Sequence, residues 1–185
     1  MVFYVERGKK EYRTKRWLQR PVLEIKGSEK EPELAAFTRG LFNSIFAAAG
    51  DGLPQGTKPL TVYLGTARDL VPIRQKLIAN QPPADAWTYN LWWAPDQREI
   101  TNGVIFILTD RLDDKEARRA LVKSLMGSAG FPDESREYRD SVLYPESKAT
   151  ELSPADQALI KLLYRTTPGL GREALLKEIT AHWGE

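Results

Sequence analysis

The sequence contains no cysteine and a single histidine among its 185 residues. Without cysteine, the chain forms no disulfide, no thiolate zinc site, no iron–sulfur cluster and no cysteine nucleophile. The one histidine, His182, lies three residues from the C-terminus. One chain therefore cannot supply the two or three imidazoles of a histidine zinc site, and a serine–histidine triad is not expected. These absences exclude much of the common hydrolase chemistry.

Long apolar runs and an excess of charge of one sign are also missing. No run approaches the ~20 apolar residues of a membrane helix, and the first residues lack the apolar core of a signal peptide. The 27 basic and 25 acidic residues leave a net charge of only +2, so no global field attracts nucleic acid or anionic lipid. With 42% hydrophobic residues and no repeat or linker, residues 1–185 are predicted to form a single globular domain.

Basic residues gather near the start of the chain, in residues 1–20. They are Arg7, Lys9, Lys10, Arg13, Lys15, Arg16 and Arg20. Aromatic residues stand between them, and such a segment can grip a phosphate backbone. A binder of nucleic acid or an anionic surface would lose salt-sensitive binding on neutralising Arg13, Lys15 and Arg16. Because no nucleic-acid module follows, we favour a solvated basic arm or edge strand.

The spacing of apolar residues predicts strands and helices along the whole chain. Strands are expected over residues 21–27, 60–65, 87–93 and 100–108, and helices over 31–49, 67–80, 112–127, 153–167 and 172–183. A Gly/Pro loop is expected over 51–58, and residues 131–151 form a polar stretch. This order predicts an α+β or α/β domain, and we adopt the α+β class. Residues 21–130 are expected to contain a mixed sheet and helices, with the sheet packed against two early helices. Residues 131–185 are expected to form a helical part.

The helix over residues 112–127 has the clearest boundaries. Asp113 and Glu116 form a capping-box pair, and Leu112 can contact Ala117 as a hydrophobic staple. Gly127 and Gly130 are expected to provide the exit from this helix. It follows five consecutive apolar residues, 104–108, which predict a central strand.

The exit from this helix resembles the metal-binding segment of another family. Residues 123–133 read Lys-Ser-Leu-Met-Gly-Ser-Ala-Gly-Phe-Pro-Asp. Metzincin-type zinc peptidases carry H-E-x-x-H-x-x-G-x-x-H/D at such a place. Lys123 and Gly127 fall at the two helical histidine positions and Ser124 at the general-base glutamate. Gly130 matches the glycine that lets the chain turn, and Asp133 matches the third ligand.

Two downstream segments extend the resemblance over residues 100–165. Ser-Val-Leu-Tyr-Pro, residues 141–145, is similar to the turn that carries methionine below the metal, with Leu143 at the methionine position. Residues 152–164 are similar to the L-S-x-x-D…L…LY helix that closes such domains. The resemblance implies a zincin-like fold, as in uncharacterised bacterial exported domains of metalloprotease-like fold, and hence an exported or cell-envelope location.

The residues that carry the zinc chemistry are replaced. An ammonium at Lys123 offers only donors, and Gly127 offers no side chain. The hydroxyl of Ser124 cannot take the proton of a metal-bound water at neutral pH, as the family's glutamate does. The sequence thus predicts no metal, no cofactor and a non-catalytic, pseudopeptidase-like domain that binds a protein or peptide partner or has a structural role. The Lys123 ammonium is a candidate to replace the ion by pairing with Asp133, although a solvated Lys123 is the simpler interpretation.

The sequence leaves two other hypotheses open. One is a hydrolase, acting on a saccharide or peptide with carboxylates in the residual cleft, and a carboxylate pair near Asp133 would favour it. The other concerns the aromatic row in residues 87–93, where Trp87, Tyr89 and Trp93 share one strand face and Trp92 takes the other. We favour core packing for this row, with Trp92 and Trp93 as the candidates for partner binding.

Overall fold

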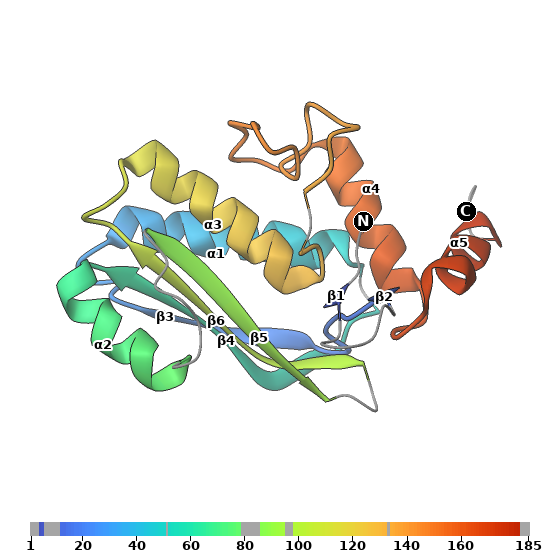
Figure 1. Ribbon diagram of the computed structural model, residues 1–185, viewed down its shortest axis with the longest axis horizontal. Coiled ribbons are helices and arrows are strands. Elements are labelled where there is room, and N and C mark those ends of the chain that lie inside the picture. The colour runs from blue at the N-terminus through green and yellow to red at the C-terminus, as the bar shows by residue number, and fades with distance from the viewer. Residues whose placement is uncertain are drawn as a thin grey trace.

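The chain folds as an α+β domain with a four-stranded mixed sheet in its described part (Figure 1). The computed structural model describes residues 4–5, 12–50, 52–78, 86–94, 98–132 and 134–181. The strands are β1 (Tyr4–Val5), β2 (Tyr12–Arg13), β3 (Arg20–Lys26), β4 (Gln55–Gly65), β5 (Trp87–Ala94) and β6 (Glu99–Leu108). The helices are α1 (Pro32–Ala48), α2 (Ala67–Leu77), α3 (Asp114–Ala129), α4 (Pro154–Arg165) and α5 (Arg172–Ala181).

The sheet has the strand order β3-β4-β6-β5. Strands β3, β4 and β6 run parallel, and β5 is antiparallel to β6 at one edge. The β5–β6 register places Tyr89 opposite Ile105, and a bulge follows Trp92. Strands β1 and β2 form a separate antiparallel pair. This order places β5 at the sheet edge and β6, the most apolar strand, in the interior, as its five consecutive apolar residues predict.

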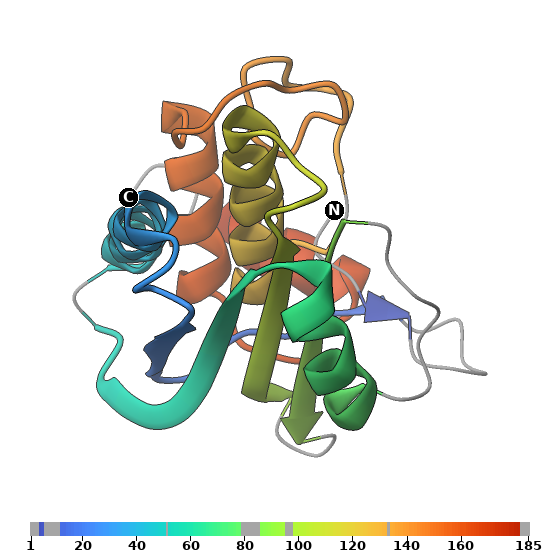
Figure 2. The same ribbon diagram turned by 90° about the vertical axis from the view of Figure 1, so that its left-hand side faces the viewer.

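The two faces of the sheet are covered unequally. Helices α1, α3 and α4 contribute to the main core on one face, and α2 lies against the other face (Figures 1 and 2). Side chains of β6 alternate between the faces, with Ile105 and Ile107 in the main core and Val104 and Phe106 under α2. The expected packing of the sheet against two early helices is therefore correct, but on opposite faces.

Local signals set the boundaries of α3 and α4. Asp113 and Glu116 form the predicted capping box of α3, and Ser153 and Asp156 form a second one at α4. At the other end of α3, Gly130 adopts a φ of 118°, which favours glycine. The prediction that Gly127 takes part in the exit is wrong, because α3 continues through it to Ala129.

Tertiary pairing changes another predicted boundary. The loop expected over residues 51–58 is wrong from Gln55 onward, since β4 begins there and pairs with β3 at Arg20. An ideal Cβ on Gly56 would lie 2.8 Å from Cβ of Gln19, so the glycine that suggested a loop instead permits close strand approach.

Part of the basic N-terminal segment belongs to the core. Lys15 and Trp17 are fully buried, and the indole Nε1 of Trp17 donates to the carbonyl of Ser128 at 2.8 Å. The amide of Ile100 donates to the carbonyl of Arg16 at 3.0 Å. The expectation of a solvated arm is therefore wrong for residues 14–17. Across the described ranges, every helix is too short or too polar to cross a membrane.

Candidate functional site

Helix α3 carries the positions that resemble a zinc peptidase motif, and it lies between α1 and the strands β5 and β6. Its buried side is made by small and aliphatic residues that pack on α1 and the sheet. Ser124 and Gly127 lie on the buried side, whereas Lys123 is half-buried. Gly130 ends the helix beside the carbonyl of Lys15, which would lie 2.7 Å from a Cβ at this position. Of the described motif positions on this helix and at its end, Ser124, Gly127 and Gly130 therefore face the interior of the fold.

The space beside Gly127 is occupied by an aromatic ring. An ideal Cβ on Gly127 would lie 2.5 Å from Cζ and 2.6 Å from Oη of Tyr89. Tyr89 reaches α3 from β5, where its side chain lies on the main-core face. No side chain fits at position 127 while the Tyr89 ring stays in place. The sequence assigned Tyr89 to the correct face of the strand but did not identify its contact with this glycine.

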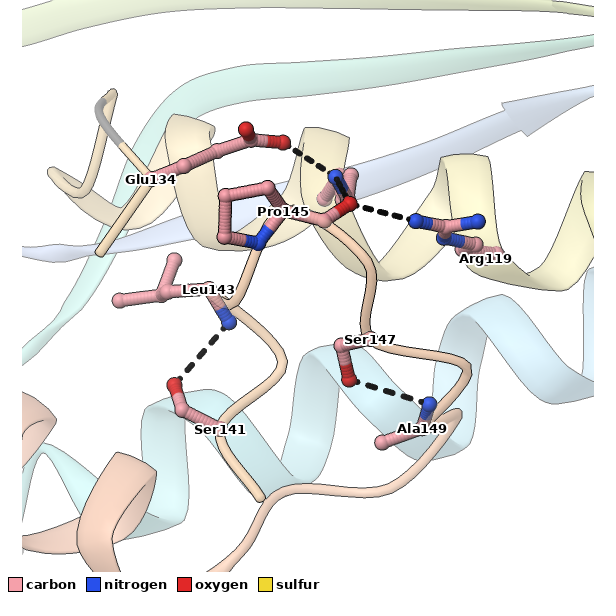
Figure 3. A network of polar contacts seen from close by, with 8 residues as sticks. Arg119, Glu134, Ser141, Leu143, Pro145, Ser147 and Ala149 are labelled. Carbon is pink, nitrogen blue, oxygen red and sulfur yellow. Dashed lines mark hydrogen bonds and ion pairs between the residues drawn. The ribbon is translucent and has the colours of Figure 1, made fainter. Parts of the chain in front are cut away.

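Lys123 lies in a polar network that joins α3 to two parts of the polar stretch (Figure 3). Its ammonium pairs with Glu134 and donates to the carbonyl of Pro145 at 3.2 Å. The Nη2 of Arg119, one turn earlier on α3, donates to the same carbonyl at 2.6 Å. The predicted partner, Asp133, lies outside the described residues. The solvated alternative for Lys123 is wrong, because its side chain is only 17% exposed and is ion-paired.

Two members of this network, Glu134 and Arg119, were not identified from the sequence. Glu134 directly follows the predicted partner, and Arg119 precedes Lys123 by four residues, which places both cations on one side of the helix. The helical spacing was therefore a usable signal for Arg119. Nothing local indicated that Pro145, 22 residues after Lys123, would bring its carbonyl to both side chains.

Ser124 occupies a closed position. The residue is fully buried, and its Oγ has no hydrogen-bond partner within the described structure. Its carbonyl accepts a hydrogen bond from Oγ of Ser128 at 2.7 Å. A buried hydroxyl with this surrounding has neither access to solvent nor a base to accept its proton. Ser124 is thus enclosed by the packing of α3 in the described structure.

The turn over residues 141–145 is fastened to α4 by a buried acidic residue. Asp156, fully buried, accepts hydrogen bonds from Oγ of Ser141 at 2.5 Å and from the amide of Val142 at 3.2 Å. The amide of Leu143 in turn donates to Oγ of Ser141 at 3.0 Å (Figure 3). Leu143 is buried in the main core. Asp156 also belongs to the capping box of α4, and only the fold reveals that it holds this turn.

The aromatic row of β5 divides between the two cores. Trp87, Tyr89 and Trp93 pack against the main core, and Trp92 packs against the cluster under α2. This is the alternation predicted from the sequence. Trp92 and Trp93 are both half-buried, and the ring of Trp93 lies 3.6 Å from the ammonium of Lys15. Both tryptophans therefore have packing roles within the fold.

Two of the basic residues singled out near the N-terminus, Lys15 and Arg16, contact other parts of the fold, whereas Arg7, Lys9 and Lys10 lie outside the described residues. Besides the buried Lys15, Arg16 donates through Nη2 to the carbonyl of Thr166 at 3.0 Å and lies over the ring of Tyr164. Burial lowers the pKa of Arg16 from its usual value, and burial raises the pKa of Tyr164. Arg13 belongs to β2, and its side chain is outside the described structure. Lys15 and Arg16 thus bind the chain itself.

Three carboxylates of the acidic pairs bind a helix end, a cation and a hydroxyl. Asp113 caps α3, Asp114 pairs with Arg118, and Glu31 accepts a hydrogen bond from Thr109 at 2.6 Å. In the described ranges, no three side chains of His, Cys, Asp or Glu come together as a metal would require. The residues at the motif positions, an ammonium, a buried hydroxyl and a glycine under a ring, do not fit the zinc ion that the resemblance implies.

Comparisons with known proteins give one result over nearly the whole chain. A family model, described as a protein of unknown function (DUF2927), matches residues 1–180. No curated protein and no solved structure matches the chain.

Proposed function

The chain belongs to the DUF2927 family, and we propose that it is a non-catalytic domain of zincin-like fold that works by binding a partner or in a structural role. One observation carries this proposal: the ring of Tyr89 occupies the space beside Gly127, where the resemblance places a zinc ligand. A zinc site requires lone pairs from several side chains that converge on one point. At this point the chain instead has an aromatic ring packed on the helix backbone.

The cation at the neighbouring position supports the same interpretation. Lys123 stands where the resemblance places the first histidine, and its ammonium has three donors and no acceptor. It binds Glu134 and the carbonyl of Pro145, so one positive charge joins α3 to the segment before the turn and to the last residue of the turn. A bound metal cation would repel this ammonium, whereas the ammonium itself can hold the loops together. The interactions of Lys123 are those of a structural tie.

Three other features of the fold support the zincin-like part of this proposal. Helix α3 follows the interior strand β6 and ends at a left-handed Gly130, and the turn over residues 141–145 is attached to α4 through Asp156. The capping box of α4 uses the Ser153 and Asp156 that the resemblance includes in the closing helix. These features support a zincin-like arrangement whose loops are stabilised by hydrogen bonds and one ion pair in place of a metal.

Native mass spectrometry with zinc tests this proposal. The protein is measured before and after addition of zinc, with a chelator control, and hydrolysis of a mixed fluorogenic peptide set is followed in parallel. We expect no retained zinc and no zinc-dependent cleavage. The matched control is His182→Ala, which removes the chain's only imidazole. One zinc per chain that this variant retains and a chelator removes would contradict the proposal, because carboxylates would then be holding a metal.

A further inference from the structure

Five consecutive exposed residues stand in the segment between α3 and α4. This protruding loop, residues 136–140, reads Arg-Glu-Tyr-Arg-Asp, and Tyr138 at its centre is 54% exposed. The segment projects beyond both helices, on the side away from the sheet (Figures 1 and 2). We infer that the protruding loop is a contact surface for a second copy of the chain, related to the first by a two-fold axis at Tyr138. The inference goes beyond the proposed function and does not depend on the absence of zinc.

The order of charges in the protruding loop is complementary to itself. Along the chain, the signs are plus, minus, the uncharged tyrosine, plus and minus. A segment that crosses a two-fold axis runs antiparallel to its copy, so residues equally distant from the axis face each other. This pairing brings Arg136 opposite Asp140 of the second copy, and Glu137 opposite Arg139 of the second copy. Each contact occurs twice, and all four join opposite charges.

These charges have no ion-pair partner inside the described chain. Across the described ranges, no ion pair includes a side chain of residues 136–140, whereas Glu134, just before the loop, is paired with Lys123. A partner of uniform charge would attract two of the loop's charged side chains and repel the other two, but a second copy attracts all four. The tyrosine at the centre adds the large amphipathic contact area that recurs at interfaces. Charge complementarity therefore favours the second copy as the occupant.

Hydrogen bonds at its base hold the protruding loop in place. The amide of Ser135 donates to the carbonyl of Leu143 at 2.9 Å, and the amide of Ser141 donates to the carbonyl of Tyr138 at 3.1 Å. The Oγ of Ser141 also donates to the buried Asp156. Because the backbone on both sides is fixed, the loop loses less conformational entropy when it meets a partner.

A hollow beside the protruding loop provides room for the second copy. It has a volume of about 610 Å³, and its lining includes Arg139 and Asp140 together with residues 144 and 146–149. The two-fold arrangement brings Arg136 and Glu137 of the second copy to the wall formed by Arg139 and Asp140. The half of each loop that precedes Tyr138 thus meets the hollow of the other copy.

The contact is small, so we expect a weak dimer. Interfaces of standard size use about 20–30 residues from each partner, whereas the protruding loop supplies five. Self-association of the full chain is expected at roughly 100 μM to 1 mM, measured by sedimentation velocity. Because salt screens exposed charges, association should weaken between about 25 mM and about 500 mM NaCl. A chain that stays monomeric at about 1 mM in low salt would overturn the inference.

Two charge reversals test the pairing directly. Arg139→Glu places a carboxylate opposite Glu137 of the second copy, and Glu137→Arg places a guanidinium opposite Arg139 of the second copy. Each variant alone should associate at least roughly tenfold more weakly than the unmodified chain, because two attractive contacts become repulsive. An equimolar mixture of the two variants should associate again, since every contact between them joins opposite charges. A mixture that stays monomeric would contradict the two-fold pairing.

Arg39→Glu is the matched control. Arg39 is exposed on α1, and its reversal changes the net charge by the same amount as Arg139→Glu. This variant should associate like the unmodified chain. An equal loss in both variants would mean that net charge governs association, and would refute the role of the loop. Recovery in the mixture compares the same two proteins alone and together, so a folding defect in either variant cannot produce it.

Discussion

Replacing Gly127 by alanine tests whether Tyr89 really occupies the space beside α3. In an open helix interior, Gly→Ala raises the free energy of unfolding by about 1 kcal/mol, because glycine loses more backbone entropy on folding. At Gly127 the new Cβ would lie 2.5 Å from Cζ of Tyr89. The ring must therefore move away from the helix or the helix must shift.

The expected magnitude follows from these opposing effects. Adding a methyl group to a filled site costs about 1–3 kcal/mol, and the helix preference returns about 1 kcal/mol. We therefore expect Gly127→Ala to be neutral or to lower the free energy of unfolding by up to about 2 kcal/mol. For a chain of this length, each kcal/mol corresponds to about 2–4 °C in Tm.

Gly40 provides a matched comparison. It lies inside α1, is exposed, and has no atom within 4 Å of an ideal Cβ. Gly40→Ala should raise the free energy of unfolding by about 1 kcal/mol in urea denaturation followed by circular dichroism. In a Tyr89→Leu background, which removes the obstructing ring atoms, Gly127→Ala should become stabilising too. Equal stabilisation by the two glycine substitutions in the unmodified chain would refute the occupied-site argument.

Two further predictions concern polar groups. Asp156→Ala should lower the free energy of unfolding by about 3 kcal/mol, because Ser141 and the amide of Val142 lose their acceptor in the buried turn. Ser153→Ala should cost only about 1 kcal/mol as a lost helix cap, and equal losses in urea denaturation would contradict the turn-fastening role of Asp156. The hydrogen bond and charge of Lys30 lower the pKa of Asp69, so this carboxylate should titrate below its usual range in NMR. Its stabilising effect is present above the usual Asp pKa and is lost as the pH falls through the lowered value. Lys30→Met should raise the pKa of Asp69 towards its usual range, and an unchanged titration curve would argue against the ion pair.

Much of the local structure was determined by the sequence alone. Strands β3, β5 and β6 and helices α1 and α3 lie close to the predicted ranges, because apolar periodicity is a property of neighbouring residues. The capping box at Asp113 was predicted for the same reason, since its partner Glu116 lies three residues away. The division of β5 between two faces also followed from simple alternation.

The tertiary structure alone decided the contacts that define the site. The carbonyl of Pro145 reaches Arg119 from 26 residues away, and Tyr89 reaches Gly127 from another element. The burial of Lys15 beside Trp93 likewise reversed the expectation that basic residues near the start stay in solvent. Local patterns do not encode such contacts, because they depend on which strands and helices become neighbours when the core is packed. The elements could therefore be predicted from short-range chemistry, whereas the closed helix face and the polar network at Pro145 formed only when distant segments came together.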